Sequence, residues 1–155
     1  MTLADLIGKK IKKIRFNYER ENAHDMQEFQ SQVMLANKEV FLIPNYPDAS
    51  FDLTEYYDKN KSSSFDTAQR CGLASRLLFR NKTIVDVHFK YADGEPLQDQ
   101  SGILELENGR YVTENNFGPP GLTDIDLIVM NQDQFEGLQD DDTELRSLKN
   151  DILDK

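Results

Sequence analysis

The sequence predicts an α+β fold made mainly of antiparallel strands, in which two similar strand–hairpin units follow one another. Residues 83–91 repeat the pattern of residues 10–18: an isoleucine, an aliphatic residue, a phenylalanine and a tyrosine recur at the same spacing. Residues 104–109 likewise line up with residues 33–38. Within these segments apolar and polar side chains alternate, which is the pattern of a strand with one buried face.

The matched blocks define two repeats, at residues 3–57 and 73–130. They keep the same order and nearly the same separation, which favours a duplication. Chance similarity is the alternative, because period-two patterns recur readily between strands. We expect one domain, residues 1–155, in which the two units form one sheet or a half-open barrel, with short helices at both ends of the chain.

The first unit begins with a helical lead-in over residues 2–7, which Thr2 can cap and Gly8 can end. A long strand is predicted over residues 11–20, where apolar and polar side chains alternate. Residues 29–35 alternate in the same way and predict the next strand of the unit.

A short apolar run over residues 40–43 ends at Pro44 and predicts a strand that is covered on both faces. Residues 45–64 are polar and predict the joint between the two units. The pattern over residues 65–73 fits either a helical turn or an irregular connector.

The second unit begins near Leu73, and its long strand is predicted over residues 84–91. Asn108-Gly109 is the clearest hairpin signal in the chain, and the alternating segments on either side of it are predicted strands. A further strand is predicted within residues 122–130, which also alternate.

Residues 131–155 form an acidic tail that is predicted to end in an amphipathic helix. Three apolar residues recur there at helical spacing: Leu145, Leu148 and Ile152. Asp141 and Glu144 have the spacing of a capping box, so the acidic triplet around them is interpreted as the start of this helix.

The composition indicates a folded, acidic protein. Nine Phe and six Tyr can fill a core, and the net charge is −10. Such a surface repels nucleic acid and anionic membranes and attracts basic proteins, although solubility alone also explains it. Cys71 is the single cysteine, so an intramolecular disulfide is excluded. We found no leader sequence and no apolar run long enough to cross a bilayer, and expect a cytoplasmic protein.

No catalytic, cofactor or metal motif stands out. His24 and His88 are isolated in sequence, and His88 is expected to face solvent because it alternates with apolar neighbours along its strand. Residues 140–142 are three consecutive aspartates, without the spaced ligands and central glycine of an EF-hand loop. The basic cluster at residues 9–15 is interpreted as the charged edge of a strand. We therefore expect no enzymatic activity, no cofactor and no bound metal.

What remains is an acidic surface for binding another protein. Carboxylates near the second hairpin and in the tail can receive lysine and arginine side chains of a partner, and nearby aromatic residues suit the centre of an interface. The candidate partner-binding residues are Glu105, Glu107, Tyr111, Glu114, Phe117, Asp124, Asp126, Asp140, Asp141 and Asp142.

Three segments resemble the immunity proteins of bacterial polymorphic toxin systems, particularly those of contact-dependent growth inhibition. They are LADLIGKKI at residues 3–11, GILELENGR at residues 102–110 and PGLTDIDL at residues 120–127. The resemblance implies a small acidic protein that binds one toxin domain, often a nuclease, and blocks its active site or its substrate surface.

Two other functions stay open at this point. The same acidity would serve a regulatory or scaffold module for an endogenous basic protein. A hydrolase would require carboxylates that are scattered in sequence to meet in one deep pocket.

Overall fold

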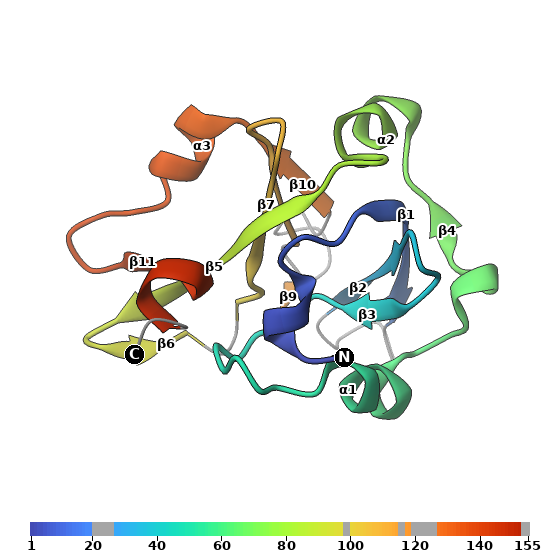
Figure 1. Ribbon diagram of the computed structural model, residues 1–155, viewed down its shortest axis with the longest axis horizontal. Coiled ribbons are helices and arrows are strands. Elements are labelled where there is room, and N and C mark those ends of the chain that lie inside the picture. Colours follow the sequence, from blue (N-terminus) through green and yellow to red (C-terminus); the bar gives the residue numbers. More distant parts are fainter. Residues whose placement is uncertain (20–26, 98–99, 115–116, 119–126, 153–155) are drawn as a thin grey trace.

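Strands dominate this computed structural model, which describes residues 1–19, 27–97, 100–114, 117–118 and 127–152 (Figure 1). Among these residues the strands form a five-stranded and a six-stranded antiparallel sheet. The predicted α+β class with two similar strand–hairpin units is confirmed. The units occupy two sheets, which are joined by a bridge between Lys10 and Thr83, instead of a single continuous sheet.

The first sheet contains the first unit. Its strands lie in the order β3 (Val40–Leu42), β2 (Gln27–Leu35), β1 (Ile11–Glu19) and β4 (Gln69–Arg70). Strand β9 (Phe117–Gly118), from the second half of the chain, also pairs with β2.

The second sheet contains the second unit. Its strands lie in the order β10 (Leu127–Met130), β8 (Tyr111–Glu114), β7 (Ile103–Leu106), β5 (Ile84–Ala92) and β11 (Glu144–Ser147). The short strand β6 (Glu95–Pro96) folds back on β5 through the turn at Asp93-Gly94.

The two units share the same pairing register. Ile14 lies opposite Val33 in the first sheet, and the corresponding residues Val87 and Leu104 lie opposite each other in the second. The ladders are also irregular at the same place, just after Ile11 and just after Ile84. Both hairpin turns need a residue with positive φ, and this residue is Lys38 (φ 73°) in one and Gly109 (φ 77°) in the other.

The units meet at a symmetric junction between Lys10 and Thr83, which are equivalent residues and form an antiparallel bridge. The backbone N–H of Gly8 donates to the carbonyl of Ile84 at 2.8 Å, and that of Asn81 donates to the carbonyl of Ile11 at the same distance. If each residue is replaced by its equivalent in the other unit, one of these two hydrogen bonds becomes the other. The junction therefore has the geometry of a pseudo-two-fold axis between the sheets.

Helical segments flank the strands. They are the 3₁₀ turns η1 (Leu3–Leu6) and η2 (Phe65–Thr67), the helices α1 (Leu53–Asn60), α2 (Leu73–Phe79) and α3 (Gln132–Glu136), and the π-helical turn η3 (Leu148–Ile152). Thr2 caps η1 together with Asp5, as a lead-in helix requires. The first strand of each unit is thus preceded by a helical segment, η1 before β1 and α2 before β5 (Figure 1).

The C-terminal helix predicted from Leu145, Leu148 and Ile152 is wrong in its first half. Residues 144–147 form strand β11, which pairs with β5, and only η3 is helical. The proposed capping box fails for the same reason: the Asp140 carboxylate accepts the N–H groups of Asp142 (2.8 Å) and Thr143 (2.8 Å) and thereby shapes a turn before the strand.

One core cluster crosses both sheets, with buried side chains from η1, from the central strands of both units and from η3. A buried carboxylate, Glu114 on β8, also ties the sheets together. It accepts the Ser31 N–H of β2 at 3.0 Å and the hydroxyls of Ser31 and Ser101. Because these donors are buried, each needs this acceptor in place of water.

We predict that Glu114→Ala lowers the free energy of unfolding by roughly 2–4 kcal/mol, because it leaves buried donors unsatisfied. Glu95→Ala removes an exposed carboxylate from β6 and is expected to change stability by less than about 0.5 kcal/mol. Urea unfolding of both variants measures the difference. Equal effects would contradict the role assigned to Glu114.

Candidate functional site

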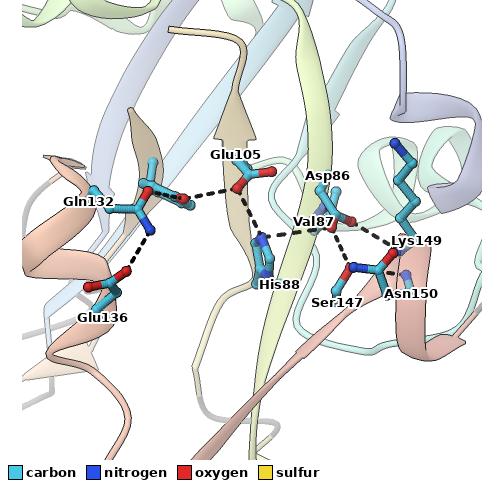
Figure 2. Close-up of polar contacts among 10 residues, drawn as sticks. Asp86, Val87, His88, Glu105, Gln132, Glu136, Ser147, Lys149 and Asn150 are labelled. Atoms are coloured by element: carbon cyan, nitrogen blue, oxygen red, sulfur yellow. Dashed lines mark hydrogen bonds and ion pairs between the residues drawn. The ribbon is translucent and has the colours of Figure 1, made fainter. Parts of the chain in front are cut away.

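Two carboxylates and a histidine meet on one face of the second sheet (Figure 2). Asp86 and His88 are two residues apart on β5, so both side chains point to the same face. Glu105 lies opposite Asp86 on β7 and completes the group. We refer to Asp86, His88 and Glu105 as the carboxylate–histidine cluster.

The histidine lies between the two carboxylates and forms no hydrogen bond with either. His88 Nε2 is 3.9 Å from Asp86 Oδ2 and 3.7 Å from Glu105 Oε1, beyond the usual range of a hydrogen bond. This nitrogen is shielded from solvent and has no hydrogen-bond partner among the residues that the structure describes. The expectation that His88 faces solvent is therefore wrong, since its side chain is only 13% exposed.

The C-terminal segment fixes Asp86 in place. Its Oδ1 accepts the N–H of Val87 at 2.8 Å and the N–H of Lys149 at 3.0 Å. The hydroxyl of Ser147, on β11, donates to Oδ2. A buried carboxylate with this many donors keeps its orientation, so β11 and η3 set the position of one side of the cluster.

A polar chain fixes Glu105 from the other side (Figure 2). The Tyr111 hydroxyl lies 2.9 Å from Glu105 Oε1 and 2.7 Å from Gln132 Oε1, and its single proton can be donated to one of them at a time. Gln132 in turn donates to Glu136 at 2.9 Å. Burial, together with the hydrogen bond to the Glu105 carboxylate, raises the pKa of Tyr111 to about 12.

Helix α3 covers the cluster with an aromatic ring. Asn131 and Gln134 form a capping box that begins the helix and places Phe135 inward. The ring of Phe135 stacks on Tyr111 with centroids 3.9 Å apart and lies 4.8 Å from the ring of His88. These contacts make one wall of the cluster apolar and limit the access of water to His88.

An open hollow of about 590 Å³ lies beside this wall, between α3 and β11, and we call it the acidic hollow. Its lining residues are His88, Phe135, Glu136, Gln139, Asp140, Asp141, Leu145 and Ser147. Glu136, Asp140 and Asp141 are exposed, and within the described part of the chain none of them forms an ion pair with a lysine or arginine. The hollow therefore combines uncompensated negative charge with an apolar floor.

The predicted partner-binding residues are not one surface. Tyr111 (3% exposed) and Glu114 (9% exposed) are buried and cannot serve as surface contacts, which corrects their assignment. Exposed Glu107 accepts the N–H of Thr83, away from the acidic hollow.

Asp140 and Asp141 line the hollow and Asp142 follows them, while half-exposed Glu105 belongs to the cluster. Backbone pairing places Phe117 on β9. Asp124 and Asp126 lie outside the described residues.

Sequence reasoning did not single out Asp86, it assigned His88 to solvent, and it missed Phe135. The signal that could have found the first two is the spacing Asp-x-His within a predicted strand, which puts a carboxylate and an imidazole on one face. The position of Glu105 follows only from the pairing of β5 with β7. The cover by α3 is a tertiary contact that no local pattern encodes.

A second pocket, which we call the basic groove, occupies the equivalent place in the first sheet. It has a volume of about 250 Å³, and its cationic lining residues are Lys12, Lys13, Arg15, Arg70, Arg76 and Arg80. Lys13 and Arg15 occupy the positions on β1 that correspond to Asp86 and His88 on β5. The position of Lys13 thus carries a carboxylate, Asp86, in the second unit, and the position of Arg15 carries a histidine.

No protein-family model, curated protein sequence or solved structure matches this chain. Among the residues that are described, we find no helix with the length and apolar character needed to span a membrane.

The raised pKa of Tyr111 predicts a loss of stability in alkali. The folded protein holds this proton more tightly than the unfolded chain, so stability falls as the pH rises from about 10 towards 12, by up to roughly 2 kcal/mol. Tyr111→Phe should remove this part of the pH dependence, and exposed Tyr46→Phe should not. Urea unfolding at pH 9 and pH 11 compares the variants, and an unchanged pH dependence in Tyr111→Phe would contradict the assignment.

Like charges oppose each other in the basic groove, because Arg15 on β1 pairs directly with Arg70 on β4. We predict that Arg70→Glu raises the free energy of unfolding by roughly 0.2–1 kcal/mol at low salt, since it replaces repulsion by attraction. Near 1 M salt the gain should largely vanish through screening. A gain that is independent of salt would show that another effect is responsible.

Proposed function

We propose that this chain is an immunity protein, which neutralises a basic toxin domain of the nuclease type by forming a stoichiometric complex in the cytoplasm. The observation that carries the proposal is the acidic hollow, where exposed carboxylates surround an apolar floor. The resemblance of residues 3–11, 102–110 and 120–127 to immunity proteins supports the same function.

The negative charge of this region is concentrated and uninterrupted. Residues 131–145 contain six carboxylates and no lysine or arginine. Those at Glu136, Asp140 and Asp141 lie on the hollow itself. Carboxylates without a basic neighbour repel one another, and a partner that supplies positive charge relieves this repulsion.

The shape of the hollow suits a long basic side chain. Lysine and arginine have an apolar stem and a charged head, so the stem can contact Phe135 and Leu145 while the head reaches the carboxylates at the rim. Arginine in addition binds carboxylates through two parallel hydrogen bonds. Side chains of this kind hold the phosphates of nucleic acid in a nuclease, and a complex that engages them prevents substrate binding.

Electrostatic potentials of opposite sign on this protein and on a basic partner also make their association fast. Electrostatic steering raises association rates by roughly 10- to 1,000-fold and is lost as the ionic strength increases. A protein that must intercept a toxin before it acts gains directly from a high association rate.

We predict that the double variant Asp141→Lys/Asp142→Lys lowers the association rate with the partner at low salt by about tenfold or more, with a smaller effect on dissociation. Asp140 is left unchanged because it shapes the turn. The control, Asp58→Lys/Glu95→Lys, makes the same change in net charge at exposed sites on α1 and β6. Surface plasmon resonance at two salt concentrations compares the three proteins, and equal losses in both variants would exclude the hollow as the binding surface.

The partner itself is identified by a pull-down from the lysate of the source bacterium, with the product of the upstream neighbouring gene included. Recovery of a basic toxin domain whose toxicity this protein suppresses establishes immunity. Recovery of an endogenous basic protein indicates the regulatory or scaffold module instead. A hydrolase becomes the better hypothesis if no partner is captured and a substrate screen gives turnover.

A further inference from the structure

We propose that Asp86, His88 and Glu105 bind one divalent transition-metal ion, with Zn²⁺ as the cation that fits the donors best. This inference goes beyond partner binding and does not depend on it. It rests on the geometry of the carboxylate–histidine cluster, on the support given to each donor, and on the adjoining hollow.

The donors converge on a common point. One donor atom from each of the three residues lies within 4.8 Å of the other two. The separations of 3.7 Å and 3.9 Å from His88 Nε2 are too long for hydrogen bonds and leave room for an ion about 2–2.5 Å from each donor. Zinc bonds to imidazole nitrogen and carboxylate oxygen are about 2.0–2.2 Å long, so small side-chain rotations complete the site.

His88 Nε2 has no hydrogen-bond partner in the described part of the chain, and this favours a ligand at this point. A shielded ring nitrogen without a hydrogen-bond partner carries an energetic cost, and a cation bound to its lone pair removes that cost. Two carboxylates and a neutral imidazole supply two negative charges, which a divalent cation balances. Imidazole nitrogen together with carboxylate oxygen is a ligand set that suits zinc and its first-row neighbours.

Each carboxylate ligand is already oriented by its own partners. Asp86 accepts the N–H groups of Val87 and Lys149 and the hydroxyl of Ser147, and Glu105 faces the hydroxyl of Tyr111. Such outer contacts hold the ligands of metal sites in position, and their loss commonly weakens metal binding by 10- to 100-fold.

The cluster lies next to the acidic hollow, and the corresponding positions of the first unit carry different side chains. His88 and Ser147 line the acidic hollow, so the cluster lies directly beside an open hollow from which an ion can approach. The corresponding residues of the first unit are Lys13, Arg15 and Met34, which cannot form an equivalent site. One ion per chain is therefore expected.

Isothermal titration calorimetry of the full chain with ZnCl₂, after dialysis against a chelator, tests the proposal. We expect one ion per chain, and at least tenfold weaker binding in His88→Gln and in Glu105→Gln. Two matched controls, His24→Gln and Glu107→Gln, change the other histidine and a carboxylate two residues beyond Glu105, and they should bind as the unmodified protein does.

A second readout guards against variants that fold poorly. Zn²⁺ should raise the Tm of the unmodified protein by roughly 5 °C when it is present well above its dissociation constant, and should leave the Tm of folded Glu105→Gln unchanged. Co²⁺ should add visible absorption bands that Zn²⁺ displaces. Absence of binding by the unmodified protein would overturn the proposal, as would undiminished binding in both cluster variants.

The competing explanation is a protonated His88 that pairs with both carboxylates. Nitrogen chemical shifts of His88 that show both ring nitrogens protonated at neutral pH, unchanged by Zn²⁺, would establish that pair and overturn the metal site. Because no toxin or other partner enters these measurements, their failure would leave the proposed immunity function untouched, and failure of the partner experiments would leave the metal site untouched.

Discussion

The bridge between Lys10 and Thr83 is the contact on which the rest of the structure depends. Around it, each unit donates to the other through matching backbone N–H groups, and the irregularities after Ile11 and Ile84 fall at matching places. Backbone hydrogen bonds are strict in length and direction, so this junction fixes how the two sheets face each other. The shared core and the buried Glu114 follow from that arrangement.

The junction also determines which edges of the sheets remain open to other segments. In the first sheet the short strand β4 pairs with β1, and in the second sheet β11 pairs with β5 at the same edge. The basic groove and the acidic hollow lie along these two edges. Each site is thus completed by a segment that is remote in sequence from the strand it joins.

The strands could be predicted from sequence because alternation of apolar and polar side chains is a local signal. The Asn108-Gly109 hairpin and the long strands of both units lie where this pattern places them. The helical spacing of Leu145 and Leu148 predicts a helix that includes residues 144–147, yet pairing with β5 decides their conformation. When the side-chain pattern of a short segment fits both a helix and a strand, pairing with the edge of a neighbouring strand outweighs its local propensity.

The candidate site could be predicted only in part, for a related physical reason. The acidity of residues 140–142 is visible in the sequence, and so is the excess of negative charge. The burial of Glu114 and His88 depends on what covers them, namely β2 in one case and α3 with β11 in the other. A charged side chain on a strand is exposed or buried according to the layer above it, and that layer is set by tertiary contacts.

The opposite charges of the basic groove and the acidic hollow have a consequence for the molecule as a whole. Strand β4 and helix α2, which flank the basic groove, and helix α3 and strand β11, which flank the acidic hollow, lie towards opposite sides of the fold (Figure 1). The charged side chains of these two pockets therefore form an electric dipole, in addition to the net charge of −10. An approaching charged macromolecule exerts a torque on such a dipole, so that the two bodies are turned towards each other before their surfaces touch.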